Sequence, residues 1–296
     1  MTEPLEALRG YVHFLHEREG VRQVKLTRVA REGLAKLSSR DTSPLPSDKS
    51  MGREETRVPT KAAAQTAPPL GQRRLPTETI AAAAIEISGS TKIDQLRHLA
   101  ERAAVCVKCP HLVARRHTVV FGVGNPDAKL MFVGEAPGEE EDLQGEPFVG
   151  RAGQLLTKMI GAMGLTRDQV YIANIVKCRP DMPAGAPGNR KPTKEEMETC
   201  VPYLRAQIEV IKPRAMVALG ATAVEGLLGP IGAIGTLRGK FHDYRGTPLM
   251  PTYHPSYLLR NQSNTEKRKV WDDLLKVMER LEMPVTEKQR GYFLSK

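Results

Sequence analysis

Short apolar runs alternate with segments of helical periodicity through the C-terminal two thirds of the chain. The runs are too short for helices and are apolar on both faces, as in strands buried on both sides. They predict four strands, over residues 129–133, 170–173, 215–219 and 248–252. Helical spacing predicts helices over residues 91–105, 153–163, 193–211, 221–228 and 263–281. This alternation predicts an α/β fold, a three-layer sandwich with a central, mostly parallel sheet flanked by helices.

The N-terminal part of the chain has a different pattern. Residues 1–37 carry apolar positions at loosely helical spacing among many charges, which predicts short amphipathic helices. From residue 38 the composition shifts to Ser, Pro, Thr, Lys and Ala, which bury too little apolar area to offset the entropy lost on ordering. We therefore predict a disordered N-terminal region with a linker over residues 38–90, a compact domain over residues 91–283, and a C-terminal tail over residues 284–296.

The amino-acid composition indicates which kind of partner the chain favours. The net charge of +10 favours a polyanion such as nucleic acid, although a solvated basic surface has the same composition. The N-terminus lacks a basic segment followed by an apolar one, so we expect no secretory signal. No apolar run is long enough to span a bilayer, so we expect no membrane partner and a cytoplasmic location.

The chain contains four cysteines. Cys106 and Cys109 form a C-x-x-C pair, Cys178 ends a polar run after the second strand, and Cys200 follows a gap rich in Gly and Pro. In a reducing compartment such clusters are more often metal sites or catalytic groups than disulfides. Four thiolates suit a tetrahedral zinc ion or an iron–sulfur cluster, and four unrelated buried thiols are the alternative.

A polar or glycine-containing motif follows each predicted strand. Glu135 follows the first strand, Asn174 the second, Gly220 the third and His254 the fourth. Loops at the carboxyl ends of parallel strands gather at one edge of the sheet, so we expect these residues to share a crevice. The Gly-rich segment 134–138 lacks the Lys and Ser/Thr of a phosphate-binding loop.

Three side chains near this crevice suit a planar, polar ligand. The Asn174 side chain carries a donor and an acceptor side by side, which matches the edge of a base. The alternative is that Asn174 caps a turn at the end of the strand. His254 can donate a hydrogen bond to a developing anion. The alternative is that it is a histidine of a surface loop without a catalytic role. Phe148 can stack on a ring, or else belong to the core. The acidic run over residues 139–142 is of a kind that is most often solvated.

Four motifs carry a resemblance to a known family. Residues 134–142, 145–153, 174–180 and 254–260, together with the four cysteines, resemble the family 4 uracil-DNA glycosylases, the iron–sulfur members of the uracil-DNA glycosylase superfamily. The resemblance covers residues 91–281. It implies an enzyme that flips uracil out of single- or double-stranded DNA and hydrolyses its N-glycosidic bond, initiating base excision repair. We accordingly expect a monomer that acts on nucleoid DNA.

The resemblance implies roles for the residues around the base. Phe148 would stack on the flipped uracil, and Asn174 would bind its N3 and O4 edge. His254 would donate a hydrogen bond to uracil O2 as negative charge develops there. Glu141 would shape the pocket near uracil C5.

The other implied roles concern the sugar, the DNA backbone and the cofactor. Glu135 and Ala136 would lie beside the attacking water. Ser256 would contact a backbone phosphate, and Leu258 would be the wedge that fills the gap left in the duplex. A structural 4Fe-4S iron–sulfur cluster would be held by the four cysteines, Cys106, Cys109, Cys178 and Cys200.

Two features depart from the family pattern. An insert over residues 181–189, between the third and fourth cysteines, is longer than we expect, and it should bulge outward without moving the cysteines. The N-terminal extension, residues 1–90, lies outside the resemblance.

Two other functions compete with a glycosylase. A related class becomes covalently trapped on uracil DNA, but it has Gln at the position of Ala136 and a reactive His in a basic loop, whereas residues 181–191 contain no His. A cluster-bearing DNA-binding module without turnover is the second alternative. The presence of Phe148, Asn174 and His254 argues against it.

Overall fold

The structure is a computed structural model that describes residues 85–180, 182 and 188–294. The amphipathic helices predicted within residues 1–37 lie outside the described residues, as do residues 38–84 of the linker predicted over 38–90 and most of the insert over 181–189. The described residues all belong to one unit of the chain, Arg74–Lys296.

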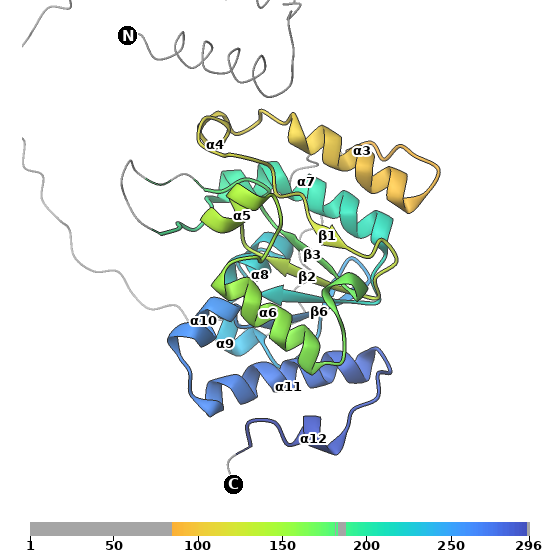
Figure 1. Cartoon of the computed structure of the whole chain (residues 1–296), viewed down its shortest axis with the longest axis vertical. Helices are drawn as coiled ribbons and strands as arrows, with labels where there is room; N and C mark the ends of the chain where they lie inside the picture. Colours follow the sequence, from red (N-terminus) through yellow and green to blue (C-terminus); the bar gives the residue numbers. More distant parts are fainter. Residues whose placement is uncertain (1–84, 181, 183–187, 295–296) are drawn as a thin grey trace, which may run out of the picture. The chain divides into compact units, whose positions relative to one another are not determined.

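The described residues form a six-stranded sheet in the order β1-β3-β2-β4-β6-β5 (Figure 1). The strands are β1 (Val123–Gly124), β2 (Leu130–Gly134), β3 (Tyr171–Asn174), β4 (Ala215–Leu219), β5 (His242–Tyr244) and β6 (Thr247–Thr252). The four central strands are parallel, while β1 and β5 pair antiparallel at the edges. The predicted mostly parallel sheet is confirmed. The edge strands were not predicted, because such short strands carry too little apolar pattern.

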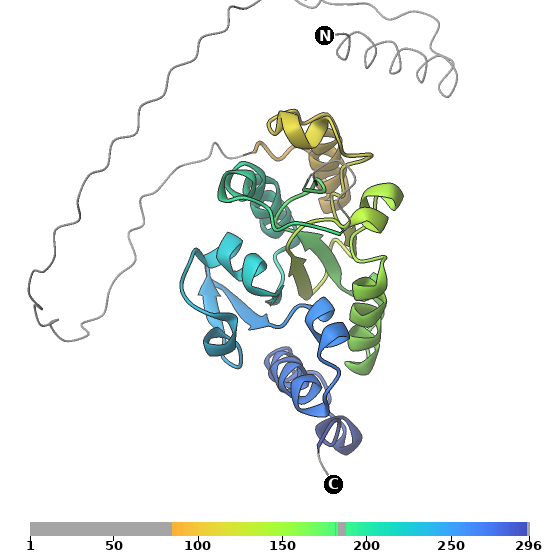
Figure 2. The ribbon, with the colours of Figure 1, turned by 90° about the vertical axis from the view of Figure 1, so that its left-hand side faces the viewer.

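Helices cover both faces of the sheet (Figures 1 and 2). One face packs against α3 (Lys92–Ala104), α7 (Lys194–Ile211) and α8 (Ala221–Leu228), and the other against α6 (Arg151–Ala162), α10 (Pro255–Arg260) and α11 (Asn264–Arg280). Successive residues of β2 alternate between the two cores, since Met131 and Val133 belong to the first and Leu130 and Phe132 to the second. The predicted three-layer sandwich is therefore confirmed.

Shorter elements connect the layers. They are α4 (Pro110–Val113), α5 (Glu139–Gln144), the 3-10 turn η1 (Arg167–Gln169), α9 (Ile234–Leu237) and α12 (Glu287–Arg290). None of the described helices is long and apolar enough to cross a lipid bilayer.

Local sequence signals fix where two long helices begin. The Thr193 hydroxyl accepts a hydrogen bond from the Glu196 main-chain nitrogen at 3.2 Å, and the Glu196 carboxylate accepts one from the Thr193 nitrogen at 2.7 Å. This capping box starts α7. Ser263 starts α11 by accepting from the Glu266 nitrogen at 3.2 Å. Both helix starts agree with the prediction.

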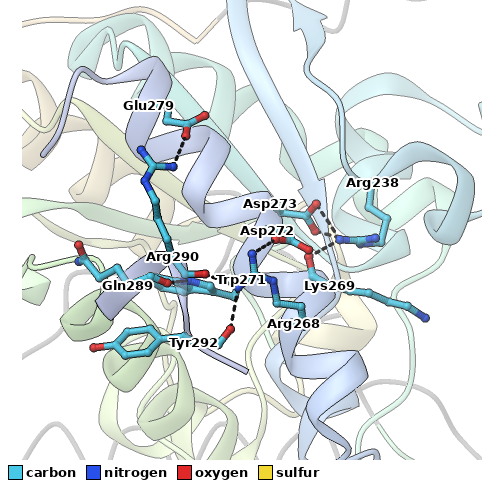
Figure 3. Close-up of polar contacts among 10 residues, drawn as sticks. All are labelled: Arg238, Arg268, Lys269, Trp271, Asp272, Asp273, Glu279, Gln289, Arg290 and Tyr292. Carbon is cyan, nitrogen blue, oxygen red and sulfur yellow. Dashed lines mark hydrogen bonds and ion pairs between the residues drawn. The ribbon is translucent and has the colours of Figure 1, made fainter. Parts of the chain in front are cut away.

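The segment after α11 is held against that helix (Figure 3). Trp271 on α11 donates from Nε1 to the Gln289 carbonyl at 2.6 Å. The Gln289 side chain donates to the Ala162 carbonyl, at the end of α6, at 2.9 Å. Arg290 pairs with Glu279 at 3.2 Å. The segment that we expected to be a C-terminal tail therefore bridges α11 and α6.

Candidate active site

A cavity of about 580 Å³ opens at the carboxyl ends of β2, β3, β4 and β6. After β2 the chain adds β3 on one side and β4 on the other, and such a switch point is where α/β sheets bind ligands. The cavity brings together most of the residues predicted for catalysis or substrate contact: Glu135, Ala136, Glu141, Phe148, Asn174, His254 and Ser256.

Asn174 ends β3 and is paired in register with Gly134, which ends β2. Its side chain is buried, and its Oδ1 has no hydrogen-bond partner among the described residues. A buried unsatisfied acceptor costs about 1–3 kcal/mol, so the site favours a ligand that supplies a donor. Gly134 is required here, because a Cβ atom would lie 2.4 Å from Asn174 Oδ1 and 2.5 Å from Phe148 Cζ.

Phe148 is buried, with its ring centroid 5.6 Å from that of His254. Its backbone is left-handed, with φ of 57°. This conformation costs a non-glycine residue about 1–3 kcal/mol and persists only where neighbouring groups hold it. Arg167 holds it here, because the guanidinium donates to the carbonyls of Pro147 at 2.8 Å and Phe148 at 3.1 Å. Sequence analysis did not identify Arg167, since no local pattern links it to this turn.

The Glu141 carboxylate holds two loops together. It accepts hydrogen bonds from the main-chain nitrogens of Gly138 at 3.0 Å, Val149 at 3.0 Å and Gly150 at 2.9 Å. Glu141 therefore ties the loop after β2 to the turn that contains Phe148, in addition to lining the cavity.

The acidic run over residues 139–142 forms most of α5. Asp142 is fully buried and accepts hydrogen bonds from the main-chain nitrogens of His117 at 3.0 Å and Thr118 at 3.3 Å. The expectation of a solvated run was wrong at this residue, because its partners lie far away in the sequence.

His254 caps the start of α10, where Pro255 is the first helical residue. Its Nδ1 accepts a hydrogen bond from the Ser256 main-chain nitrogen at 3.1 Å and lies 2.8 Å from Ser256 Oγ. Because a main-chain N–H is directed at Nδ1, the neutral ring carries its proton on Nε2. Burial, followed by the charge of Arg260, lowers the pKa of His254 to about 4. At pH 7 His254 is therefore a neutral imidazole with an Nε2–H donor.

The strand that leads to His254 is anchored from α11. Thr252, two residues earlier, donates from Oγ1 to the buried Asp273 carboxylate at 2.6 Å. Arg238 pairs with the same carboxylate at 2.9 Å (Figure 3). Burial raises the pKa of Asp273 to about 6, against the hydrogen bond from Thr252 and the charge of Arg238. These contacts fix the end of β6 at the cavity.

Glu135 and Ala136 follow β2 and line the cavity. Burial raises the pKa of the Glu135 carboxyl, while a hydrogen bond with Thr222 and the charge of Lys191 oppose the rise. The Glu135 carbonyl accepts a hydrogen bond from the Val176 nitrogen at 3.1 Å, which fixes the main chain of the loop. A partly desolvated carboxylate in a cavity suits proton transfer or the stabilisation of a cation.

The structure also brings the four cysteines together. Cys106 follows α3, Cys109 precedes α4, Cys178 follows β3, and Cys200 lies in α7. Besides burial, the charges of Cys178 and Cys106 contribute to raising the pKa of Cys109, and those of Cys178 and Cys109 contribute to raising the pKa of Cys200. The four sulfurs are therefore near neighbours. All four are free thiols in the structure.

Hydrogen-bond donors are directed at two of the sulfurs. The Arg116 guanidinium donates to Cys178 Sγ at 3.1 Å, and the Lys177 main-chain nitrogen donates to Cys200 Sγ at 3.2 Å. Burial raises the pKa of Cys109 and Cys178, and it raises that of Cys200 to about 12. Donors at the sulfurs and a bound cation both stabilise thiolates, so the site suits a metal cofactor. No group of three or more Cys, His, Asp or Glu side chains in the described part of the chain is arranged so that it could hold a metal ion.

Leu258, for which the resemblance implies a wedge role, is buried in the described structure. It is 5% exposed and packs into the core that contains α6 and α11. The neighbouring Leu259 is partly exposed. In this structure Leu258 is a core residue, because the helical turn of α10 directs it inward.

Four polar cavity residues were not identified as site residues from the sequence: Asn189, Arg190, Thr222 and Arg260. Asn189 and Arg190 follow residues 183–187 of the insert, which lie outside the described residues, so the C-terminal end of the insert reaches the cavity and does not simply bulge outward. Arg190 pairs with the buried Glu196 at 2.6 Å. Against the effect of burial, hydrogen bonds from Arg190 and His111 lower the pKa of Glu196 to about 2.

Comparison with known proteins agrees with this fold and cavity. A family model described as the Uracil DNA glycosylase superfamily matches residues 121–275. The chain is 48% identical to the type-4 uracil-DNA glycosylase of Thermotoga maritima, over 63% of this chain and 94% of that protein. It is 40% identical to the type-4 uracil-DNA glycosylase of Sulfurisphaera tokodaii, over 68% of this chain and 91% of that protein.

The chain therefore belongs to the uracil-DNA glycosylase superfamily. Its similarity to type-4 enzymes confirms the family indicated by the four sequence motifs, and with it the assignment to the DNA glycosylases.

Proposed function

We propose that the cavity binds a uracil flipped out of DNA and that the chain hydrolyses its N-glycosidic bond, leaving an abasic site and initiating base excision repair. The observation that carries this proposal is the buried, unpaired Oδ1 of Asn174, in a cavity that also contains Phe148 and the neutral His254. The names of the type-4 relatives support the same reaction.

Uracil matches the hydrogen-bonding groups of Asn174. The uracil N3–H donates to Asn174 Oδ1, and uracil O4 accepts a hydrogen bond from the Asn174 Nδ2 amide group. Cytosine exchanges both groups, so it would face the same amide with two mismatches. Phe148 stacks on the ring, and Glu141 shapes the wall near C5 while it holds the loops in place.

His254 stabilises the leaving group. As the bond between sugar C1′ and uracil N1 breaks, its electron pair stays with the base, and positive charge develops on the sugar. The His254 Nε2–H donates to uracil O2, which becomes increasingly negative. A preorganised donor at such an oxygen contributes about 2.7–4 kcal/mol. A neutral ring provides this hydrogen bond while uracil leaves as an anion.

The attacking water lies beside Glu135 and Ala136. Its oxygen adds to C1′, and its proton passes to the Glu135 carboxylate. Burial raises the pKa of that carboxyl, which makes it a better proton acceptor. Ser256 orients His254 and contacts a DNA phosphate, and Arg260 at the edge of the cavity adds a positive charge for the DNA backbone.

A 4Fe-4S cluster would be held by the thiolates of the four cysteines. The donors directed at Cys178 Sγ and Cys200 Sγ support this assignment, because they stabilise thiolates. When bound, the cluster supplies a cross-link between segments distant in sequence and no hydrolytic chemistry.

The partner is uracil-containing DNA, single- or double-stranded, bound by a monomer whose catalytic domain spans residues 91–283. Because the substrate is nucleoid DNA, we place the activity in the cytoplasm. The net charge of +10 supports a polyanionic partner.

The experiment is a single-turnover assay with purified protein on single-stranded, U·G and U·A oligonucleotides, with matched thymine oligonucleotides as controls. Release of free uracil and an abasic site supports the proposal. A covalent protein–DNA adduct would indicate the trapped class, and binding without cleavage would indicate a module without turnover. Either of these two results would exclude the proposed reaction.

A further inference from the structure

Lys177 is a buried lysine three residues after Asn174. It is 1% exposed, and its contacts among the described residues include no carboxylate. Its Nζ donates to the Asn174 main-chain carbonyl at 2.9 Å and to Gln207 Oε1 at 2.5 Å, and it lies 5.7 Å from the centroid of the Phe121 ring. Moving an ammonium group out of water is costly, so packing alone would favour an apolar side chain at this position.

The lysine's second acceptor is itself fixed. Gln207 is fully buried in α7, and its Nε2 donates to the Phe121 carbonyl at 3.0 Å and to the Tyr171 hydroxyl at 3.1 Å. Tyr171 begins β3, the strand that Asn174 ends. The network therefore connects both ends of β3 to α7.

The main chain of Lys177 is also held on both sides. Its nitrogen donates to Cys200 Sγ at 3.2 Å, and its carbonyl accepts from the Val120 nitrogen at 2.8 Å. Because the Lys177 backbone is fixed in this way, the hydrogen bond from Nζ holds the Asn174 carbonyl at a defined position relative to that backbone.

We propose that Lys177 is a positioning residue for base recognition, which acts by fixing the Asn174 main chain from behind the cavity. The proposal rests on the proposed function, because it takes Asn174 as the residue that binds the uracil edge. Without the ammonium group, the Asn174 carbonyl and the Gln207 amide lose a shared donor, and the segment relaxes to find others. The Asn174 amide then no longer faces uracil at the correct angle.

The test compares two oligonucleotides that resist hydrolysis, one with 2′-fluoro-2′-deoxyuridine and one with 2′-fluoro-2′-deoxycytidine at the same site. Their affinities are measured for the full chain and for Lys177→Met, which keeps a long side chain and removes the ammonium group. We expect the ratio of uracil to cytosine affinity to fall about tenfold, the effect of one misaligned hydrogen bond. Iron content should stay unchanged, because the main-chain bond to Cys200 remains.

Val277→Ala is the matched control. Val277 is fully buried on α11 in the core on the opposite face of the sheet, so its truncation lowers stability without touching the network. The control should keep the wild-type affinity ratio. Lys177→Gln, whose side chain is too short to reach the Asn174 carbonyl, should lower the affinity ratio as Lys177→Met does. It serves as the test variant if Lys177→Met does not fold.

The outcomes separate the two proposals. A wild-type ratio in a folded Lys177 variant would overturn the positioning role and leave the lysine as a structural residue. A wild-type protein that binds both analogues equally would instead contradict base recognition by the cavity, and with it the proposed function.

Discussion

The Ser256 main-chain nitrogen donates to His254 Nδ1 at 3.1 Å, so these two residues fix the tautomer of the imidazole. The Ser256 hydroxyl lies 2.8 Å from the same ring nitrogen. A side-chain substitution cannot remove the main-chain donor, which belongs to the turn that starts α10. The catalytic contribution of the Nε2–H is therefore tested at His254 itself.

His254→Ala should slow the chemical step by roughly 10²–10³, because it removes a preorganised donor at the departing uracil. Affinity for uracil DNA should change little, since phosphate contacts supply most of it. The measurements are the single-turnover cleavage rate and the binding affinity at fixed salt. His98→Ala, on the exposed surface of α3, is the control and should behave as wild type. A wild-type rate for His254→Ala would falsify the leaving-group role.

The same residue predicts a pH dependence of stability. The pKa of His254 is lowered from 6.5 to about 4 in the folded protein. Between these pH values the unfolded chain binds a proton at His254 that the folded chain does not, so the folded state loses stability as the pH falls. The loss should be about 1–3 kcal/mol by pH 4.

The measurement is the free energy of unfolding in urea, from pH 7 to pH 4, for wild type and His254→Ala. Their difference isolates His254, because Asp273, whose pKa is raised to about 6, titrates in both proteins. A difference that stays constant over this pH range would contradict a neutral His254 with a lowered pKa.

Loss of a cysteine should reduce folding yield more than it changes the chemistry of the folded fraction. Cys109→Ala should lower iron content, the brown absorbance and the midpoint of thermal unfolding, because the cluster cross-links distant segments. The wild type should carry about four irons per chain, as a cubane cluster requires. Val107→Ala, at an exposed position between the first two cysteines, is the control. Zinc without iron after anaerobic purification would contradict the cluster.

Much of the fold could be predicted because its central elements are long and regular. The strand over Ala215–Leu219 and the helix over Ala221–Leu228 have the predicted bounds, since an apolar run and a helical pattern adjoin at Gly220. The antiparallel edge strands have only two and three residues, too few for a pattern. The site was predictable where a polar residue directly follows a strand, as Asn174 and His254 do.

Other parts of the site depend on contacts that a local pattern does not contain. Arg167 holds the strained turn at Phe148 from 19 residues away. Gln207 meets Lys177 across 30 residues, and His117 meets the buried Asp142 across 25. The burial of Leu258 was not predicted for a different reason. Its place relative to His254 was inferred from the motif, whereas its burial depends on how α10 packs against α6.

Leu258→Ala should lower the free energy of unfolding by about 2–5 kcal/mol, as expected for a leucine truncated in a core. If α10 moves on binding and releases the side chain as a wedge, the variant should also bind duplex more weakly, with a smaller effect on single strands. The measurements are urea unfolding and affinity for matched single- and double-stranded oligonucleotides, with Leu259→Ala for comparison. Equal losses on both substrates would leave Leu258 as a core residue without a wedge role.

Recognition of uracil by Asn174 is the central claim, and base choice tests it most directly. The measurement is the single-turnover excision rate of Asn174→Asp on oligonucleotides that carry uracil or cytosine at one site. Asn125→Asp, in the loop after β1, is the control. A carboxylate presents two acceptors and no donor, so it is mismatched with uracil O4 but can accept a hydrogen bond from the cytosine N4 amino group, and each mismatched buried group costs about 1–3 kcal/mol. Asn174→Asp should therefore lose uracil excision and gain weak cytosine excision, while the control keeps the wild-type rate. Unchanged uracil excision by Asn174→Asp would contradict the account.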